Sequence, residues 1–195
     1  LLDLDNTDPQ YGLIFLNVQL LTSQSICLVL CDICPNFRYS ERFRKETADS
    51  KLKLKRDTIK IQEYEKSVVQ FYQLYLKRLV RMVEATVLTG NKSKSKSNFI
   101  KAMITSPEAR LQISSVAVNC LSKMLDAHPN FNFSDQIIDI LVRVFCNTFQ
   151  DLKPLRQICS ETFKRLFQAD KLGDCSLKAI THFSEHILQQ NYRVD

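Results

Sequence analysis

The feature that most constrains this fold is a run of 46 residues, from Glu41 to Thr86, without glycine or proline. Lys, Glu, Leu and Gln, which favour helices, make up much of this run. The whole chain has only 3 glycines and 5 prolines in 195 residues, which disfavours a turn-rich all-β fold. No stretch alternates apolar and polar residues strictly enough to prefer a strand. The sequence therefore predicts an all-α protein.

Four segments of one helical solenoid are expected along the chain. Residues 1–40 hold an apolar helix and a connector, and residues 41–90 form one long helix that is basic at its start. Residues 91–106 are a mobile basic loop, because their low-complexity composition offers little that can pack. Residues 107–195 form two antiparallel helix pairs. The first helix is expected to be buried, although its polar residues make it a poor membrane span.

The second half of the long helix carries two apolar seams at heptad-like spacing. Such a helix packs between two neighbours instead of lying on a surface. The seams are Ile61, Tyr64, Val68, Phe71, Tyr75 and Met82, and Val69, Tyr72, Leu76, Leu79 and Val83.

The C-terminal pairs resemble helical repeats. Pro107 and Pro154 each open a pair, and their interval of 47 residues lies at the upper edge of the HEAT and armadillo range of about 40–47. Ser106 and Ser134 are expected to cap helices. The predicted fold is therefore a HEAT/armadillo-like solenoid with one long helix. Its C-terminal core is expected to contain Leu155, Ile158, Phe163, Leu166 and Phe167.

Positive charge is concentrated in one segment. The formal net charge is +6, and +5 of it falls between residues 38 and 60. This segment is predicted to contact nucleic acid or an acidic partner, although a solvated helix face explains the charge equally well. Three aromatic residues lie among its first basic residues: Phe37, Tyr39 and Phe43. This arrangement is typical of single-stranded RNA recognition; alternatively, the rings pack the connector against the preceding helix. The predicted contact residues are Arg38, Arg42, Arg44, Lys45, Lys51, Lys53, Lys55, Arg56 and Lys60.

The sequence gives no support for catalysis, a metal or a cofactor. Cys31-x-x-Cys34 and His182-x-x-x-His186 have the spacing of zinc ligands, but the cysteines end an apolar helix, whereas zinc ribbons place such a pair on a tight turn. The seven cysteines lie mostly in apolar helical patterns, as in proteins of a reducing, intracellular compartment. No nucleotide-binding, hydrolase or zinc-protease motif is present. We expect a protein that is not an enzyme.

Several blocks of residues resemble the nucleolar complex-associated protein 3 family of large-subunit ribosome assembly factors. The resemblance covers residues 20–195 and is most specific in the C-terminal blocks. The blocks are Asp32–Arg38, Glu63–Glu65 with Phe71–Leu76, His128–Phe133, Phe163–Phe167, Asp170–Gly173 and Asn191–Val194.

The resemblance implies a nuclear, nucleolar scaffold without catalytic activity. It implies a second nucleolar complex protein, pre-rRNA and other pre-60S assembly factors as partners. The expected role is in rRNA processing and intranuclear transport of the particle, with neither a membrane nor a small-molecule substrate. The alternative is a karyopherin-like armadillo solenoid that binds peptide segments, but the regularly spaced Asn and Trp of such a groove are not matched in a chain without Trp.

Overall fold

The computed structural model describes residues 9–35, 56–88, 107–147 and 149–189. All regular elements in these ranges are helical, which confirms the all-α prediction; HEAT-like repeats stay a prediction. The expectations for the connector, the start of the long helix and the loop at 91–106 lie outside the described residues. The α-helices are α1 (Pro9–Ile33), α3 (Arg56–Val83), α5 (Pro107–Ala127), α6 (Ser134–Phe145), α7 (Lys153–Ala169) and α8 (Asp174–Gln189). A π-helical turn, η1 (Glu84–Leu88), extends α3, and a 3-10 turn, η3 (Gln150–Leu152), precedes α7.

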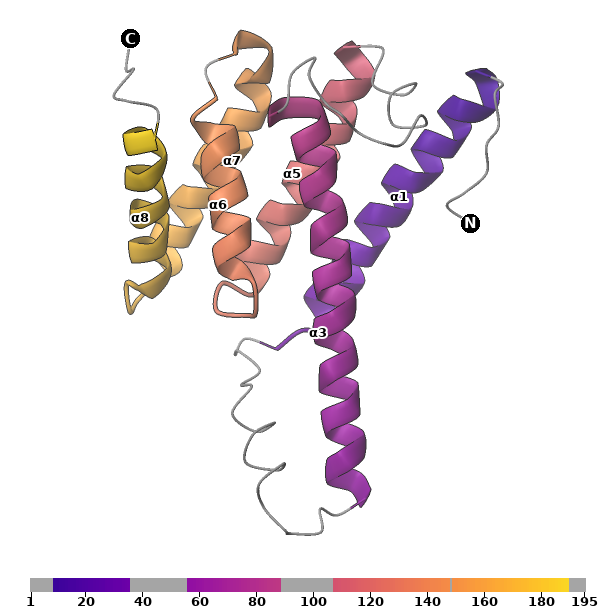
Figure 1. Cartoon of the computed structure of the whole chain (residues 1–195), viewed down its shortest axis with the longest axis vertical. Coiled ribbons are helices and arrows are strands. Elements are labelled where there is room, and N and C mark those ends of the chain that lie inside the picture. The colour runs from indigo at the N-terminus through magenta and orange to yellow at the C-terminus, as the bar shows by residue number, and fades with distance from the viewer. Residues whose placement is uncertain (1–8, 36–55, 89–106, 148, 190–195) are drawn as a thin grey trace.

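The helices stack side by side, with α1 at one edge and α8 at the other (Figure 1). Helix α5 is central and contacts α1, α3, α6 and α7. Helix α6 contacts α7 and α8, so the layers follow the order of the chain. Only the C-terminal half of α3 lies against the stack, and its N-terminal half extends beyond it (Figure 1).

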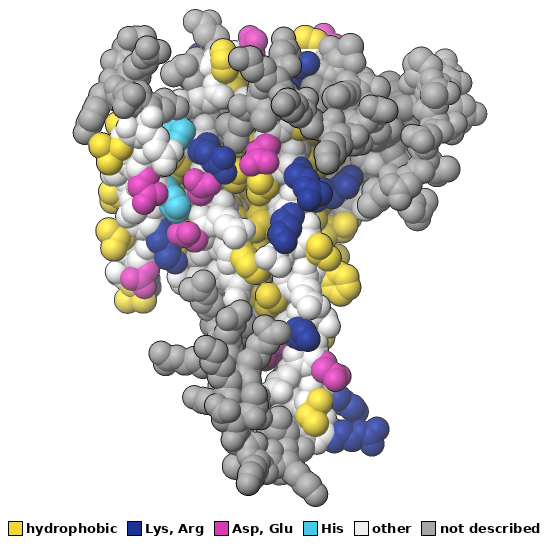
Figure 2. All heavy atoms as spheres, viewed as in Figure 1, with side chains coloured by type: hydrophobic (Ala, Val, Ile, Leu, Met, Phe, Trp, Pro, Cys, Tyr) yellow, Lys and Arg dark blue, Asp and Glu magenta, His cyan; other side chains and the backbone are white. Residues whose placement is uncertain are grey.

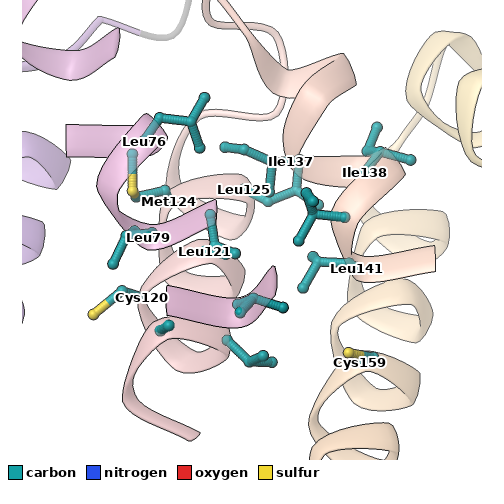
Figure 3. Close-up of a cluster of buried hydrophobic side chains, with 14 of the residues drawn as sticks. Leu76, Leu79, Cys120, Leu121, Met124, Leu125, Ile137, Ile138, Leu141 and Cys159 are labelled. Atoms are coloured by element: carbon teal, nitrogen blue, oxygen red, sulfur yellow. The ribbon is translucent and has the colours of Figure 1, made fainter. Parts of the chain in front are cut away.

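One hydrophobic core joins α3, α5, α6 and α7. Leu79 of α3, Leu121 and Leu125 of α5 and Leu141 of α6 are fully buried in it (Figure 3). Burial of such side chains stabilises the fold by about 1.5–3 kcal/mol each. This core fixes the C-terminal half of α3 and so determines the direction in which its other half points.

The two-seam expectation for α3 is only partly right. The buried side chains form one face, which contains Val68, Tyr72, Tyr75, Leu76, Leu79 and Val83. Ile61, Tyr64 and Phe71 of the first seam are exposed, and Phe71 is 67% exposed. These side chains are exposed because α3 extends beyond its neighbours, and none of the described residues covers its first three turns.

Helix α1 is less buried than its composition suggests. Leu20, Cys27 and Leu30 are buried, whereas Leu21 and Leu28 are mostly exposed. By length and composition alone, residues 16–33 also suffice to cross a membrane, which corrects the view that they are too polar. Contact with α5 accounts for the buried face.

Two further expectations need correction. Ser134 is not the cap of α6: Phe133 occupies that position in the left-handed region, with φ 69°, and no side chain caps the helix. Phe163 and Leu166 are buried as expected, but Phe167, in the last turn of α7, is 43% exposed. It stacks on Phe163 with ring centroids 6.2 Å apart, so it covers the core without entering it.

Candidate nucleic-acid interface

Two of the nine predicted contact residues fall within the described part of the chain. Arg56 and Lys60 lie on the first turns of α3, and both are exposed. The other seven lie outside the described residues: Arg38, Arg42, Arg44, Lys45, Lys51, Lys53 and Lys55. Within the described residues, the candidate interface therefore lies on α3.

The N-terminal half of α3 projects from the stack. No residue before Val68 is buried in this helix. The run from Arg56 to Ser67 has good helix formers and an acidic residue, Asp57, in its first turn, which favours the N-terminal end of the helix dipole. A rigid helix that is fixed at one end can therefore present basic side chains up to about 18 Å from Val68, the first core residue of the helix.

Basic residues continue along α3 beyond the predicted segment, and we call them the basic face. At 100° per residue they fall within about 120° of arc, opposite the buried face. From the first to the last, they span about 38 Å at 1.5 Å per residue. Figure 2 shows Lys and Arg side chains spread along this helix. The basic face contains Arg56, Lys60, Lys66, Lys77 and Arg81, all of them exposed.

Sequence reasoning missed the last three residues of this face. The basic segment predicted from the sequence ends at Lys60, because Lys66, Lys77 and Arg81 are separated by apolar residues in the sequence. Helical periodicity was the signal that could have found them, since basic residues that are separated in sequence recur on one side of a helix.

The basic face forms no ion pairs within the described residues, although the exposed Glu63 lies on the same side of the helix. None of its five side chains forms an ion pair there; the described ion pairs instead involve Arg143, Arg165 and His182. Over Arg56–Val83 there are six basic and three acidic residues, for a net charge of +3. The excess comes from Lys77, Arg78 and Arg81, because the three acidic residues equal in number the three basic residues before Val68. The net positive charge of α3 as a whole favours contact with an anionic surface.

Two exposed aromatic rings lie beside the basic face. Tyr64 follows Lys60 by one turn, and Phe71 follows two turns later on the same side. Tyr64 is 55% exposed, so its ring can be reached from solvent. Exposed rings beside basic side chains suit single-stranded RNA, because bases stack on the rings while Lys and Arg contact phosphates.

Three polar and aromatic contacts fix the base of α3. The Tyr75 hydroxyl donates a hydrogen bond of 2.6 Å to the carbonyl oxygen of Ser23 on α1. The Tyr72 ring meets Phe131 edge-on, with centroids 4.9 Å apart. Next to it, Nε2 of His128 lies 2.7 Å from the carbonyl oxygen of Cys31, which requires the proton on Nε2. The His128–Phe133 connector therefore ties α3, α1 and α5 together.

The cysteines lie inside this packing. The Cys27 thiol donates to the carbonyl oxygen of Cys120 at 3.5 Å, across the contact of α1 with α5. The interaction with Cys120 and burial hold the pKa of Cys27 well above its ordinary value. Burial also raises the pKa of Cys34 to about 11 and that of Cys159 to about 12. These three groups are protonated core thiols at neutral pH.

The residues weighed as a zinc set are far apart in the fold. Cys31 and Cys34 lie on or just after α1, whereas His182 and His186 belong to α8 at the opposite edge (Figure 1). Nε2 of His182 is 3.2 Å from a carboxylate oxygen of Asp135. Among the described residues, no group of three or more His, Cys, Asp or Glu side chains is arranged to hold a metal ion.

Comparison with known proteins identifies the family. A family model described as NOC3p, nucleolar complex-associated protein, matches residues 2–75. Nucleolar complex protein 3 homolog of Danio rerio is 30% identical over 188 residues, which cover 96% of this chain and 21% of that protein. Its Homo sapiens counterpart is 30% identical over 177 residues, or 91% of this chain and 20% of that protein. The chain belongs to the nucleolar complex-associated protein 3 family.

The similarity extends to fungi and covers a limited part of each relative. Nucleolar complex-associated protein 3 of Schizosaccharomyces pombe is 26% identical over 180 residues, which cover 92% of this chain and 21% of that protein. The chain thus spans about one fifth of the length of these relatives. Family membership places the chain in the nucleolus, within the nucleus. The matched residues 2–75 include α1 and most of α3.

Proposed function

We propose that this chain is a non-catalytic scaffold in large-subunit ribosome biogenesis and that the basic face of α3 binds pre-rRNA. It would do so within pre-60S particles, together with a second nucleolar complex protein, and support rRNA processing and intranuclear transport of the particle. The observation that carries the proposal is a row of exposed basic side chains along one side of α3, none of them ion-paired within the described residues, in a member of a nucleolar family. The names of the relatives are those of nucleolar complex proteins and not of enzymes.

The chemistry of the basic face favours phosphate contact over base reading. Lys and Arg on one helix side can reach successive phosphates, but such contacts carry little sequence information. Each phosphate contact releases counterions, so binding weakens with salt by about 0.7 per contact on single strands, on a double-logarithmic scale. Tyr64 and Phe71 would add sequence-tolerant stacking, worth about 1–3 kcal/mol per base.

A charge-reversal experiment tests the proposal. The test variant changes Arg56, Lys60 and Lys66 to Glu, and the matched control changes Lys153, Lys164 and Lys171, which are exposed on or after α7. Binding of a single-stranded pre-rRNA segment is measured by fluorescence anisotropy between about 50 and 300 mM salt. We expect the test variant to lose affinity and to flatten the salt dependence by about 2, since three contacts contribute about 0.7 each. Equal losses in the test and control variants would contradict a specific role for α3.

A protein partner on the same helix is the second candidate. Ile61, Tyr64, Phe71 and Leu74 are all more than half exposed, and such a row of apolar side chains is typical of a helix that docks a partner. Crosslinking in isolated particles distinguishes pre-rRNA binding from the docking of a protein partner. Adducts of Lys60 and Lys66 to RNA support pre-rRNA binding, whereas adducts to protein alone support the second candidate.

A further inference from the structure

Three cysteine thiols lie together where α1 packs on α5. The Cys27 thiol is 3.5 Å from the carbonyl oxygen of Cys120. One turn later on α1, the Cys31 thiol is 3.8 Å from the carbonyl oxygen of Lys123. The Cys27 side chain also hydrogen-bonds to the side chains of Cys120 and Cys31. Cys27 is therefore within reach of both other thiols, and we call these three cysteines the thiol cluster.

The members of the thiol cluster differ in their access to solvent. Cys27 is 1% exposed and Cys120 is 2% exposed, so the contact of α1 with α5 closes over both. The Cys120 sulfur points away from Leu141 of α6 (Figure 3). Cys31, in contrast, is only half-buried. A small oxidant can therefore reach the thiol cluster through Cys31.

The two buried thiols ionise at different pH values. The hydrogen bond with Cys120 and burial hold the pKa of Cys27 well above its ordinary value. The same hydrogen bond, joined by the positive charge of Lys123, lowers the pKa of Cys120 to about 7 in spite of its burial. Because the thiolate is the form that attacks sulfur, Cys120 is the nucleophile of the pair and Cys27 provides the sulfur that it attacks.

We propose that the thiol cluster is an oxidation site, at which hydrogen peroxide converts Cys27 and Cys120 into a disulfide that joins α1 to α5. The two thiols give up two protons and two electrons, the O–O bond of the peroxide breaks, and two water molecules are released. In a reducing compartment such a bond forms when oxidant is supplied and is reversed by other thiols. None of the three cysteines belongs to the basic face of α3, so the site does not depend on pre-rRNA binding.

Cys31 receives the oxidant and passes the oxidation on. Its thiolate attacks one peroxide oxygen and becomes a sulfenic acid, and the hydroxide that leaves takes up a proton to form water. The Cys27 thiol then attacks the Cys31 sulfur, loses its proton and expels a second water molecule. Finally the Cys120 thiolate attacks the Cys27 sulfur, and the Cys31 thiolate that leaves takes up a proton, so that Cys31 is restored.

The geometry of α1 favours this last exchange. The Cβ atoms of residues four apart on a helix are about 5–6 Å from each other, whereas those of a relaxed disulfide are about 3.5–4.5 Å apart. A bond between Cys27 and Cys31 is therefore strained, and strained disulfides exchange readily. The bond from Cys27 to Cys120 is free of this constraint, because the two residues lie on different helices. It joins residues that are 93 apart in the sequence, and closing so long a loop stabilises the fold.

Peroxide treatment of the purified chain tests the site. After the remaining free thiols are alkylated, mass spectrometry of the unreduced peptides should find Cys27 joined to Cys120. Relative to the untreated chain, the melting temperature should rise by about 4 °C or more, as expected for a bond that closes a long loop in a chain of this size, and dithiothreitol should reverse the rise. Cys159→Ala, which removes a buried thiol of α7 outside the thiol cluster, should give the same disulfide and the same rise over its own untreated form. Cys120→Ala should give neither.

A second comparison tests the entry of the oxidant through Cys31. Cys31→Ala should form the disulfide between Cys27 and Cys120 severalfold more slowly than the wild type, because its two remaining cluster thiols are buried. A wild-type chain in which peroxide leaves Cys27 and Cys120 unjoined, or in which the stable product joins Cys27 to Cys31, would overturn the proposal. So would a Cys31→Ala chain that is oxidised as fast as the wild type.

Discussion

The Tyr75 hydroxyl donates its hydrogen bond to the carbonyl oxygen of Ser23, at 2.6 Å, and thereby joins α3 to α1 across 52 residues of sequence. Tyr75 is buried, and desolvation holds the pKa of its hydroxyl well above the ordinary value. The bond lies at the base of the projecting half of α3, where a small change in angle would move the basic face through a large arc. Tyr75 therefore acts as a fixed point for the candidate interface.

Replacement of Tyr75 by Phe should destabilise the chain by about 0.5–1.5 kcal/mol, the usual contribution of one such hydrogen bond. Urea unfolding followed by circular dichroism measures the difference. Tyr64→Phe is the matched control, because the Tyr64 side chain is exposed. Equal stability of Tyr75→Phe and the wild type would mean that the bond contributes nothing net.

A second prediction concerns two phenylalanines that are one turn apart on α7. Phe163 is 4% exposed and Phe167 is 43% exposed. Phe163→Ala should cost about 3–5 kcal/mol because it leaves a cavity in a packed site, whereas Phe167→Ala should cost well under half of that. Chemical denaturation of both variants gives the two values. Similar losses would show that Phe167 is as much a part of the core as Phe163.

The sequence predicts which residues can pack, but not how far each helix extends beyond its neighbours. The periodicity of α3 correctly marked Tyr72, Leu76 and Leu79 as core residues. It marked Ile61 and Phe71 as well, because spacing alone cannot tell a covered turn from a projecting one. Burial of an apolar stripe depends on the length of the partner helix, and that length is a property of the whole fold.

Local capping rules failed at Ser134 for a related reason. A serine before an apolar run is a good helix cap in isolation. Here Phe131 is buried edge-on against Tyr72, and Phe133 stacks on the same ring with centroids 6.2 Å apart. This packing pulls Phe133 into the cap position at positive φ, so tertiary contacts override the local preference.

Thiol chemistry supplies the third prediction. Five cysteines are buried, and Cys31 and Cys146 are only half-buried. Ellman's reagent at pH 8 should modify at most these two rapidly, and the remaining five only after unfolding, because reaction needs an accessible thiolate. A Cys31→Ala, Cys146→Ala variant should lose the rapid phase. More than two rapid thiols in the native wild-type chain would contradict the core assignment.

The last prediction is a pH dependence at the turn that leads into α8. The carboxylate of Asp170 accepts hydrogen bonds from the backbone N–H of Gly173, at 3.0 Å, and from the backbone N–H and hydroxyl of Ser176, at 2.7 and 2.8 Å. These bonds, first of all that from the Ser176 N–H, lower the pKa of Asp170 below its ordinary 3.8. Because the folded-state pKa is the lower one, the carboxylate stabilises the fold above pH 3.8, and this contribution is lost as the pH falls through the folded-state value. Asp170→Ala should cost about 1 kcal/mol at pH 7, as expected for a lost helix cap, and the difference from wild type should shrink in urea unfolding below pH 3.8. Asp151→Ala, an exposed carboxylate before α7, is the control; a pH-independent difference for Asp170→Ala would assign the loss to packing instead of charge.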